Sequence, residues 1–283
     1  MIIPTTTRSQ TSSLDIGGVW IACRRCGSGQ PVLLAHGIPG DLRTLQPVAE
    51  RLADRFEAIT VSLPALPKSE RPSRPFGTAA QADDLVDLIT SLARGPVHLV
   101  AWSYSAHAAM AVAAAKGDMV RSLCLYEPGF PTFVADETAR DQAFADTMAA
   151  FGPVAEALAR GDRQGALRLA VDGAAGRSGH FDGQSEEVRE IHRDTADMLQ
   201  ELFSQTPPVP LGPADVAAIR CPATVARGAG TRVCYRIVSD EAARLIPGAR
   251  HVVIPNAGHL LPEQDPNAFA ALVRDHLFQA AGR

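Results

Sequence analysis

The sequence predicts an α/β protein: a mostly parallel sheet of eight strands, flanked by helices and interrupted by a helical insertion. Two observations predict this class. Short apolar runs, typical of buried strands, alternate with helix-like segments along most of the 283 residues. The alternation stops over residues 131–213, where Ala, Asp, Glu, Arg and Gln recur at helical spacing without a strong strand signal. With 46% hydrophobic residues, a chain of this length can form one core and carry an insertion.

The predicted strands are short apolar runs bounded by turn residues. Gly17 and Gly18 separate the first two, which are therefore expected to form a hairpin. The later strands alternate with helix-like segments, so we expect them to run parallel. The eight predicted strands are residues 13–16, 19–25, 31–35, 58–62, 96–102, 120–126, 223–227 and 250–254.

The helices expected to cover this sheet show apolar residues three and four positions apart. In the segment 78–93, for example, Leu85, Ile89 and Leu92 share one face. The helices expected in the core are residues 45–54, 78–93, 105–116, 236–246 and 266–280.

The insertion is expected to hold helices of its own. They are predicted over residues 144–151, 154–160, 164–171 and 186–203, with a glycine-rich loop between the last two. A proline-rich stretch over 207–210 is a stiff connector back to the sheet. We therefore predict a core domain of residues 1–130 and 214–283, and a helical cap, or lid, of residues 131–213.

Composition excludes several classes of function. A net charge of −4 gives no general attraction to nucleic acid or to an anionic membrane. No apolar run approaches the roughly 18 residues that span a bilayer. Residues 1–13 are polar, lack the apolar segment of a secretory signal and are expected to be a flexible tail. Five scattered cysteines suit a reducing cytoplasm better than a disulfide framework. The sequence thus predicts a cytoplasmic protein that binds a small-molecule substrate, and leaves a homodimer open.

A metal site is not expected. Cys23 and Cys26 form a C-x-x-C pair, but residues three apart in a strand point to opposite faces. No second cysteine pair completes a zinc site. No cofactor is called for either. Lys68, Arg71 and Arg74, in a proline-containing loop, are expected to lie on a solvated loop rather than to contact an acidic group of a substrate.

Ser103 lies between a predicted strand that ends at Trp102 and an alanine-rich helical run. A serine in this position is typical of the nucleophile elbow of hydrolases, a tight turn that lifts the hydroxyl clear of both elements. The usual pattern is G-x-S-x-G, whereas Ala101 and Ser105 flank this serine. The structural alternative is a serine that only caps the helix.

A serine nucleophile needs a base and donors for an oxyanion. His259 follows Gly258 in the loop after the predicted strand 250–254 and is the expected base. Residues 36–40, His-Gly-Ile-Pro-Gly, directly follow another strand and are the expected oxyanion loop. The backbone N–H groups of Ile38 and Tyr104 are the predicted donors.

The order of oxyanion loop, elbow, inserted lid and terminal Gly-His resembles that of the α/β-hydrolase superfamily, over residues 13–277. This resemblance implies the α/β-hydrolase fold, with Ser103 as the nucleophile and His259 as the base. It further resembles the branch whose lid follows the strand after the nucleophile helix.

The third catalytic residue is where the chain departs from that family. Many members carry an aspartate in a G-x-x-D setting after the penultimate strand, and Thr231 stands at the matching position. Glu127 follows the strand 120–126 and projects from the same edge of the sheet as Ser103 and His259. Haloalkane dehalogenases and zearalenone-type lactone hydrolases include members with a glutamate there. We therefore predict Glu127 as the orienter of His259, the alternative being a glutamate that caps a strand end.

The sequence thus predicts a serine hydrolase that cleaves a carboxylic ester or lactone through an acyl-enzyme. Three alternatives stay open: a carbon–carbon bond hydrolase, a non-hydrolytic cyclase or lyase, and a ligand-binding protein on the same scaffold. Trp102 and Phe133 are candidate substrate-binding residues, together with Tyr104, Phe144, Phe151 and Phe203.

Overall fold

The computed structural model describes residues 10–63 and 75–282. The first nine residues of the predicted tail, and Lys68, Arg71 and Arg74, lie outside the described residues. The eight predicted strands are confirmed, with every bound within three residues of the predicted one. They are β1 (Gln10–Ile16), β2 (Val19–Cys26), β3 (Gln30–Ala35), β4 (Phe56–Val61), β5 (Val97–Trp102), β6 (Val120–Tyr126), β7 (Ala223–Gly228) and β8 (Arg250–Ile254).

The strands form one sheet in the order β1-β2-β4-β3-β5-β6-β7-β8. β1 and β2 form the expected hairpin, whose turn residues Gly17 and Gly18 have positive φ angles of 65° and 90°. β2 also pairs antiparallel with β4, and all remaining pairs are parallel. The parallel strands therefore end at a common edge, where open α/β sheets place their ligands.

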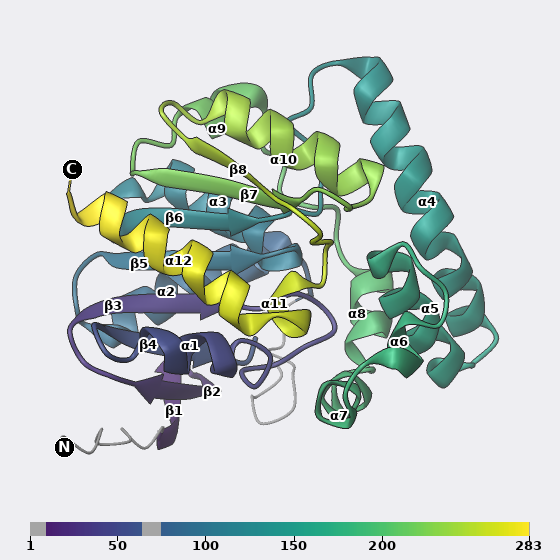
Figure 1. Ribbon diagram of the computed structural model, residues 1–283, viewed down its shortest axis with the longest axis horizontal. Helices are drawn as coiled ribbons and strands as arrows, with labels where there is room; N and C mark the ends of the chain where they lie inside the picture. The colour runs from purple at the N-terminus through teal and green to yellow at the C-terminus, as the bar shows by residue number, and fades with distance from the viewer. Residues whose placement is uncertain (1–9, 64–74, 283) are drawn as a thin grey trace.

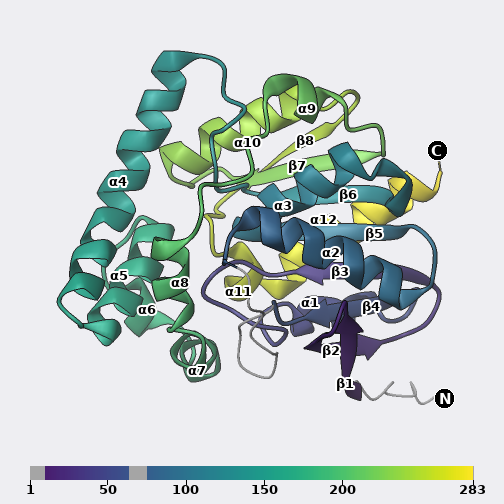
Figure 2. The same cartoon turned by 180° about the vertical axis from the view of Figure 1, so that it is seen from behind.

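Helices cover both faces of this sheet because its central strands are apolar on both sides. In β5, Leu99 and Ala101 belong to one buried cluster, and Val100 and Trp102 belong to the other. Figure 1 shows α1 (Gln46–Leu52) and α12 (Pro266–Ala281) on the near face. Figure 2 shows the opposite face with α2 (Thr78–Leu92), α3 (Tyr104–Ala115), α9 (Pro213–Ala217) and α10 (Val233–Leu245). A 3₁₀ turn (Gly117–Met119) and the short helix α11 (Leu261–Gln264) complete this part.

The segment between β6 and α9 is helical and lies beyond the carboxyl edge of the sheet (Figure 1). It consists of α4 (Glu137–Ala159), α5 (Arg163–Ala175), α6 (His180–Gly183), α7 (Glu186–Asp194) and α8 (Met198–Ser204). The side chains of Asp136, Asp162 and Ser185 cap the first turns of α4, α5 and α7.

The structure corrects the predicted helix breaks at two places in this segment. A break between residues 151 and 154 is absent, because Pro153 is accommodated inside α4, where Val154 and Ala157 are buried against the rest of the cap. Conversely, the single helix predicted over 186–203 is two helices. α7 ends at Asp194, and the hydroxyl of the next residue, Thr195, donates to the Ile191 carbonyl. A side chain that competes for backbone carbonyls weakens helix continuation.

Ion pairs join these cap helices to the core. Arg232, which precedes α10, binds Asp146 of α4 at 2.7 Å, and the same carboxylate accepts from the backbone N–H of Cys234. Arg43 of the core lies 2.9 Å from Asp194 at the end of α7. Within residues 10–63 and 75–282, no helix combines the length and apolarity needed to cross a bilayer.

Candidate active site

Ser103 occupies a strained turn between β5 and α3. Its backbone angles are φ 57° and ψ −118°, a conformation that residues other than glycine rarely adopt. The backbone N–H of Ser103 donates to the Tyr126 carbonyl at 2.9 Å, which ties the turn to the neighbouring strand β6. A Cβ atom on Gly37 would lie 3.2 Å from the Ser103 Cβ, so glycine allows the loop after β3 to approach. This geometry is that of a nucleophile elbow.

Ser105 explains how the elbow differs from the usual glycine pattern. Its side chain is fully buried, and its hydroxyl donates to the backbone carbonyl of His36. The same hydroxyl accepts a hydrogen bond from the Gln81 amide at 2.7 Å. Ser105 therefore connects α2, the first turn of α3 and the expected oxyanion loop. A glycine here would leave the His36 carbonyl and the Gln81 amide without this partner.

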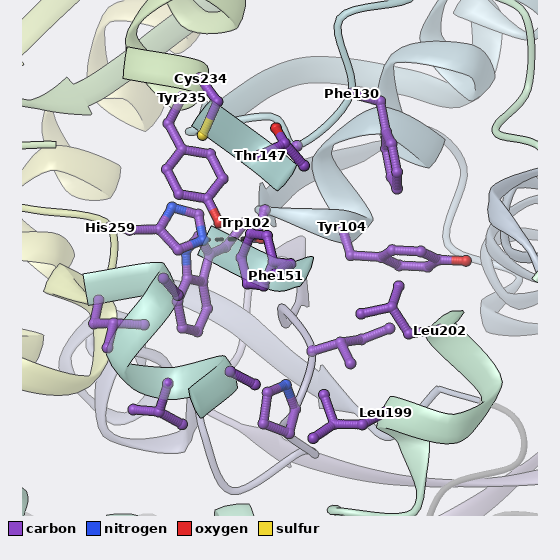
Figure 3. Close-up of a pocket in the computed structure, with 18 of the residues that line it drawn as sticks. Trp102, Tyr104, Phe130, Thr147, Phe151, Leu199, Leu202, Cys234, Tyr235 and His259 are labelled. Carbon is purple, nitrogen blue, oxygen red and sulfur yellow. Dashed lines mark hydrogen bonds between the residues drawn. The ribbon is translucent and has the colours of Figure 1, made fainter. Parts of the chain in front are cut away.

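His259 lies in the loop after β8 and reaches Ser103. Its Nε2 lies 3.0 Å from the Ser103 Oγ (Figure 3). The loop is held from two sides: the Tyr126 hydroxyl donates to the Gly258 carbonyl at 2.6 Å, and the Gly230 N–H donates to the Ala257 carbonyl at 2.9 Å. A Cβ atom on Gly228 would lie 2.2 Å from the Ala257 oxygen, so only glycine fits beneath this loop.

Glu127 lies directly after β6, with φ 47°, and its side chain is fully buried. Its Oε2 lies 2.8 Å from the His259 Nδ1 and accepts a hydrogen bond from the Thr231 hydroxyl at 2.7 Å. Its Oε1 accepts from the backbone N–H of Gly228 at 2.7 Å. Three donors thus surround a group that, when ionised, only accepts. Because the carboxylate accepts a hydrogen bond from Nδ1–H, the ring proton stays on Nδ1, and the His259 Nε2 is left to accept from the Ser103 hydroxyl.

Thr231 occupies the position where many relatives carry the acid, and here it serves as a donor. Its contact with Glu127 brings the two positions together on one carboxylate. Asp240, the next acid along the chain, binds Arg227 and His251 instead. The carboxylate at the imidazole is therefore that of Glu127.

Two aromatic side chains contact the imidazole. The Tyr235 ring lies parallel to it, with centroids 3.7 Å apart and planes inclined by 4° (Figure 3). The Trp102 ring lies 5.7 Å away at 49°. Burial raises the pKa of Tyr235 well above its usual value, so the phenol stays neutral. Sequence reasoning missed Tyr235, because nothing in the local sequence signals this stacking across the fold.

The predicted oxyanion donors lie where the elbow and the loop after β3 meet. Ile38 and Tyr104 both line the cavity that contains Ser103 and His259. Within the described residues, their backbone N–H groups have no hydrogen-bond acceptor, so both are available. Burial lowers the pKa of His36, at the start of the loop, so its imidazole is neutral at pH 7.

The cavity has a volume of about 310 Å³ and is lined mainly by apolar side chains from the core and the cap. Of the candidate substrate-binding residues, Trp102, Tyr104, Phe151 and Phe203 line it. Other apolar lining residues are Ile38, Pro39, Phe130, Val171, Leu199, Leu202 and Leu260. His192 of α7 also lies on the wall, and its Nε2 is 2.9 Å from Glu263 of α11.

The structure corrects the expected position of Phe133. It was expected to line the pocket, but its ring is fully buried in the core cluster that also contains Val134 and Ala143, and it is not part of the cavity wall. Burial of an aromatic ring in such a cluster is favourable. Phe144 does not line this cavity either, and most of its surface is exposed.

In the described part of the chain, no group of three or more His, Cys, Asp or Glu side chains is placed to hold a metal ion. Cys23 and Cys26 are both buried free thiols.

Comparison with known proteins agrees with this fold. Residues 32–272 match the family model described as "Alpha/beta hydrolase family". The 2-(acetamidomethylene)succinate hydrolase of Mesorhizobium japonicum is 26% identical in an alignment of 266 residues that covers 89% of this chain and 90% of that protein.

Two solved structures show the likeness of fold. A thermophilic esterase from Thermogutta terrifontis (malate bound) gives a TM-score of 0.72 at 23% identity, over 96% of this chain and 99% of that one. The haloalkane dehalogenase DbeA from Bradyrhizobium elkani USDA94 gives a TM-score of 0.74 at 21% identity, over 97% and 99%.

Proposed function

The chain belongs to the alpha/beta hydrolase family, and from this premise we propose that it is a serine hydrolase that cleaves a carboxylic ester or lactone of a small organic molecule. One observation carries the proposal. A hydroxyl, an imidazole and a buried carboxylate follow one another at 3.0 and 2.8 Å, at the carboxyl edge of the sheet and on the wall of a cavity. Such a chain of partners is what activates a serine hydroxyl.

The reaction would proceed through two acyl-transfer steps. The Ser103 Oγ attacks the carbonyl carbon while its proton passes to the His259 Nε2, and Glu127 stabilises the imidazolium. The carbonyl oxygen, now negative, accepts hydrogen bonds from the Ile38 and Tyr104 N–H groups. The carbon–oxygen bond then breaks, and the alkoxide takes the proton from His259. Water, deprotonated by His259, releases the acid and restores Ser103.

The nucleophile decides between this reaction and others found on similar folds. Dehalogenases and epoxide hydrolases form an alkyl ester on a carboxylate, whereas the elbow here presents the hydroxyl of Ser103. The carboxylate of Glu127 is fully buried and bonded to three donors, so it is not available to attack. This supports acyl transfer over nucleophilic substitution at an sp³ carbon.

The cavity supports a largely apolar substrate. Aromatic and branched aliphatic side chains form most of its wall, and a volume of about 310 Å³ suits a small organic molecule. Glu127 follows β6, as in the zearalenone-type lactone hydrolases that the sequence resembles, which favours lactones among the esters. The curated relative that hydrolyses 2-(acetamidomethylene)succinate adds that compound as a substrate to test.

We further propose that residues 131–213 act as a lid. Leu199 and Leu202 of α8, with Phe151 of α4, form part of the cavity wall (Figure 3). Specificity would then reside in the cap and catalysis in the core.

A labelling experiment tests the proposed function. Wild-type protein should hydrolyse p-nitrophenyl butyrate and lose this activity in Ser103→Ala. A fluorophosphonate should modify Ser103 alone, as mapped by peptide mass spectrometry. Ser91→Ala is a matched control, because Ser91 lies on the exposed side of α2, where its hydroxyl donates to the Asp15 carbonyl. Labelling of another residue, with Ser103 unmodified, would contradict the proposal.

A further inference from the structure

Both ring nitrogens of His259 have hydrogen-bond partners. Its Nδ1 lies against Glu127 and its Nε2 against Ser103, at 2.8 and 3.0 Å. The two ring faces are the remaining surface through which the protein can act on this group. Tyr235, in the first turn of α10, covers one face almost in parallel, with centroids 3.7 Å apart and planes inclined by 4°.

An aromatic face carries negative charge density and attracts a cation placed over it. His259 becomes such a cation when it takes the proton of Ser103. Both rings are nearly excluded from water, Tyr235 with 5% and His259 with 4% of its surface exposed. Cation–π attraction is strongest for a pair that has lost its water, so this stack favours the charged state of the reaction.

The stack also fixes the plane of the imidazole. The ring could otherwise rotate about its Cβ–Cγ bond, which would move Nε2 away from Ser103. Contact with a ring that is itself packed in the core, beside Ile237 and Val238, limits this rotation. A flat stack at 3.7 Å leaves the imidazole one orientation in which both nitrogens keep their partners.

We propose that Tyr235 is a positioning residue for His259, whose ring face stabilises the imidazolium and holds the ring plane during acyl transfer. This inference rests on the proposed function. The hydroxyl of Tyr235 plays no part in it. Other charged or titratable groups near the pair are Glu127, Asp146, Arg232, Cys234 and Glu263, and all are left unchanged by the test.

Three substitutions separate the ring face from the hydroxyl. Tyr235→Phe keeps the face and removes the hydroxyl, whereas Tyr235→Leu and Tyr235→Met remove the face. We expect kcat/KM for p-nitrophenyl butyrate to stay within about threefold in Tyr235→Phe and to fall roughly 5- to 30-fold in the other two. The fall should lie in kcat. The acid limb of the pH–rate profile should move to lower pH by roughly one unit, because the imidazolium loses stabilisation.

Phe151→Leu is the matched control. Phe151 is another aromatic residue of the cavity wall, on α4, and should change KM without moving the acid limb. An unmoved acid limb in Tyr235→Leu and Tyr235→Met, with kcat unchanged, would overturn the inference. An equal loss in Tyr235→Phe would also overturn it, since the hydroxyl would then carry the effect.

A measurement without turnover keeps the test independent of the proposed function. The ¹H–¹⁵N NMR signals of His259, assigned with a His259→Gln variant, are titrated in folded wild type and in each Tyr235 variant. The inference requires that the titration midpoint of His259 fall in Tyr235→Leu and Tyr235→Met but not in Tyr235→Phe. If wild type hydrolyses no ester, the proposed function fails, and this titration still decides the role of Tyr235.

Discussion

Replacing Glu127 by glutamine should disable the site through the tautomer of His259. Glutamine matches the size of Glu127 but offers one acceptor and one NH₂ group. The backbone N–H of Gly228 is a fixed donor 2.7 Å from Oε1, so the amide oxygen must face it. The NH₂ group then faces the His259 Nδ1 and forces the ring proton onto Nε2. An Nε2–H cannot accept the proton of Ser103.

The expected loss follows from the charges in the structure. Glu127 and the imidazolium of His259 meet through a 2.8 Å hydrogen bond, which places their charge centres roughly 4 Å apart. At an effective dielectric constant of about 20 this attraction is worth about 4 kcal/mol, or a factor of about 10³ in rate. The wrong tautomer adds to this loss, so kcat/KM should fall on the order of 10³- to 10⁴-fold.

Steady-state kinetics on p-nitrophenyl butyrate measures the fall in kcat/KM, and thermal unfolding shows whether the Glu127→Gln variant is folded. Most of the loss should be in kcat. Retention of a tenth or more of wild-type kcat/KM by Glu127→Gln would refute the assignment of Glu127 as the acid.

A second pair of variants tests whether an aspartate at position 231, where many relatives carry the acid, can replace Glu127. The Thr231 hydroxyl lies 2.7 Å from the Glu127 Oε2, so an aspartate at 231 can reach the space that Glu127 vacates. Glycine tolerates the φ of 47° at position 127. Glu127→Gly with Thr231→Asp should therefore be at least roughly tenfold more active than Glu127→Gly alone.

Two further predictions concern stability and the loop that carries His259. Burial lowers the pKa of His98 to about 4 and that of His276 to about 3. Between these values and about pH 6.5 the unfolded chain binds more protons, so stability is full above about pH 6.5 and falls as the pH drops. Urea unfolding at pH 7 and pH 5 should show a loss of about 2 kcal/mol for each histidine, and equal stability at both pH values would contradict this. Gly228→Ala places a Cβ 2.2 Å from the Ala257 carbonyl, which must displace the His259 loop. We expect kcat to fall by a factor of about 10² or more, with a lower Tm. Wild-type values of kcat and Tm in this variant would contradict the prediction, because the loop would then accommodate the added methyl group without displacing His259.

The parts of this molecule that the sequence predicts well depend on neighbours along the chain. Ser103 could be found because a buried strand, a serine and a helix follow one another directly. Glu127 and His259 could be found because parallel strands bring their carboxyl ends to one edge. These are local signals combined with one rule of topology. The bounds of the strands agree for the same reason, since each is a short apolar run that ends at turn residues.

The parts that escaped prediction depend on contacts between distant segments. α4 continues through Pro153 because its buried face packs against other cap helices, an effect that local propensity does not contain. Phe133 looks like any aromatic residue near the cap, and only the path of the loop after β6 buries it. Tyr235 carries no motif, and it meets His259 because α10 and the loop after β8 converge over the sheet edge.

Two of the departures from the common family pattern, at positions 127 and 231, depend on each other physically. With Glu127 in place, an aspartate at 231 would put two carboxylates within about 3 Å, and such a pair must share a proton. A protonated acid cannot hold the Nδ1 proton of His259 as strongly. Thr231 removes that conflict and adds a donor to the remaining carboxylate, at 2.7 Å. Thr231→Asp in otherwise wild-type protein should therefore lower activity even though it restores the common residue, because the site can use either carboxylate but not both.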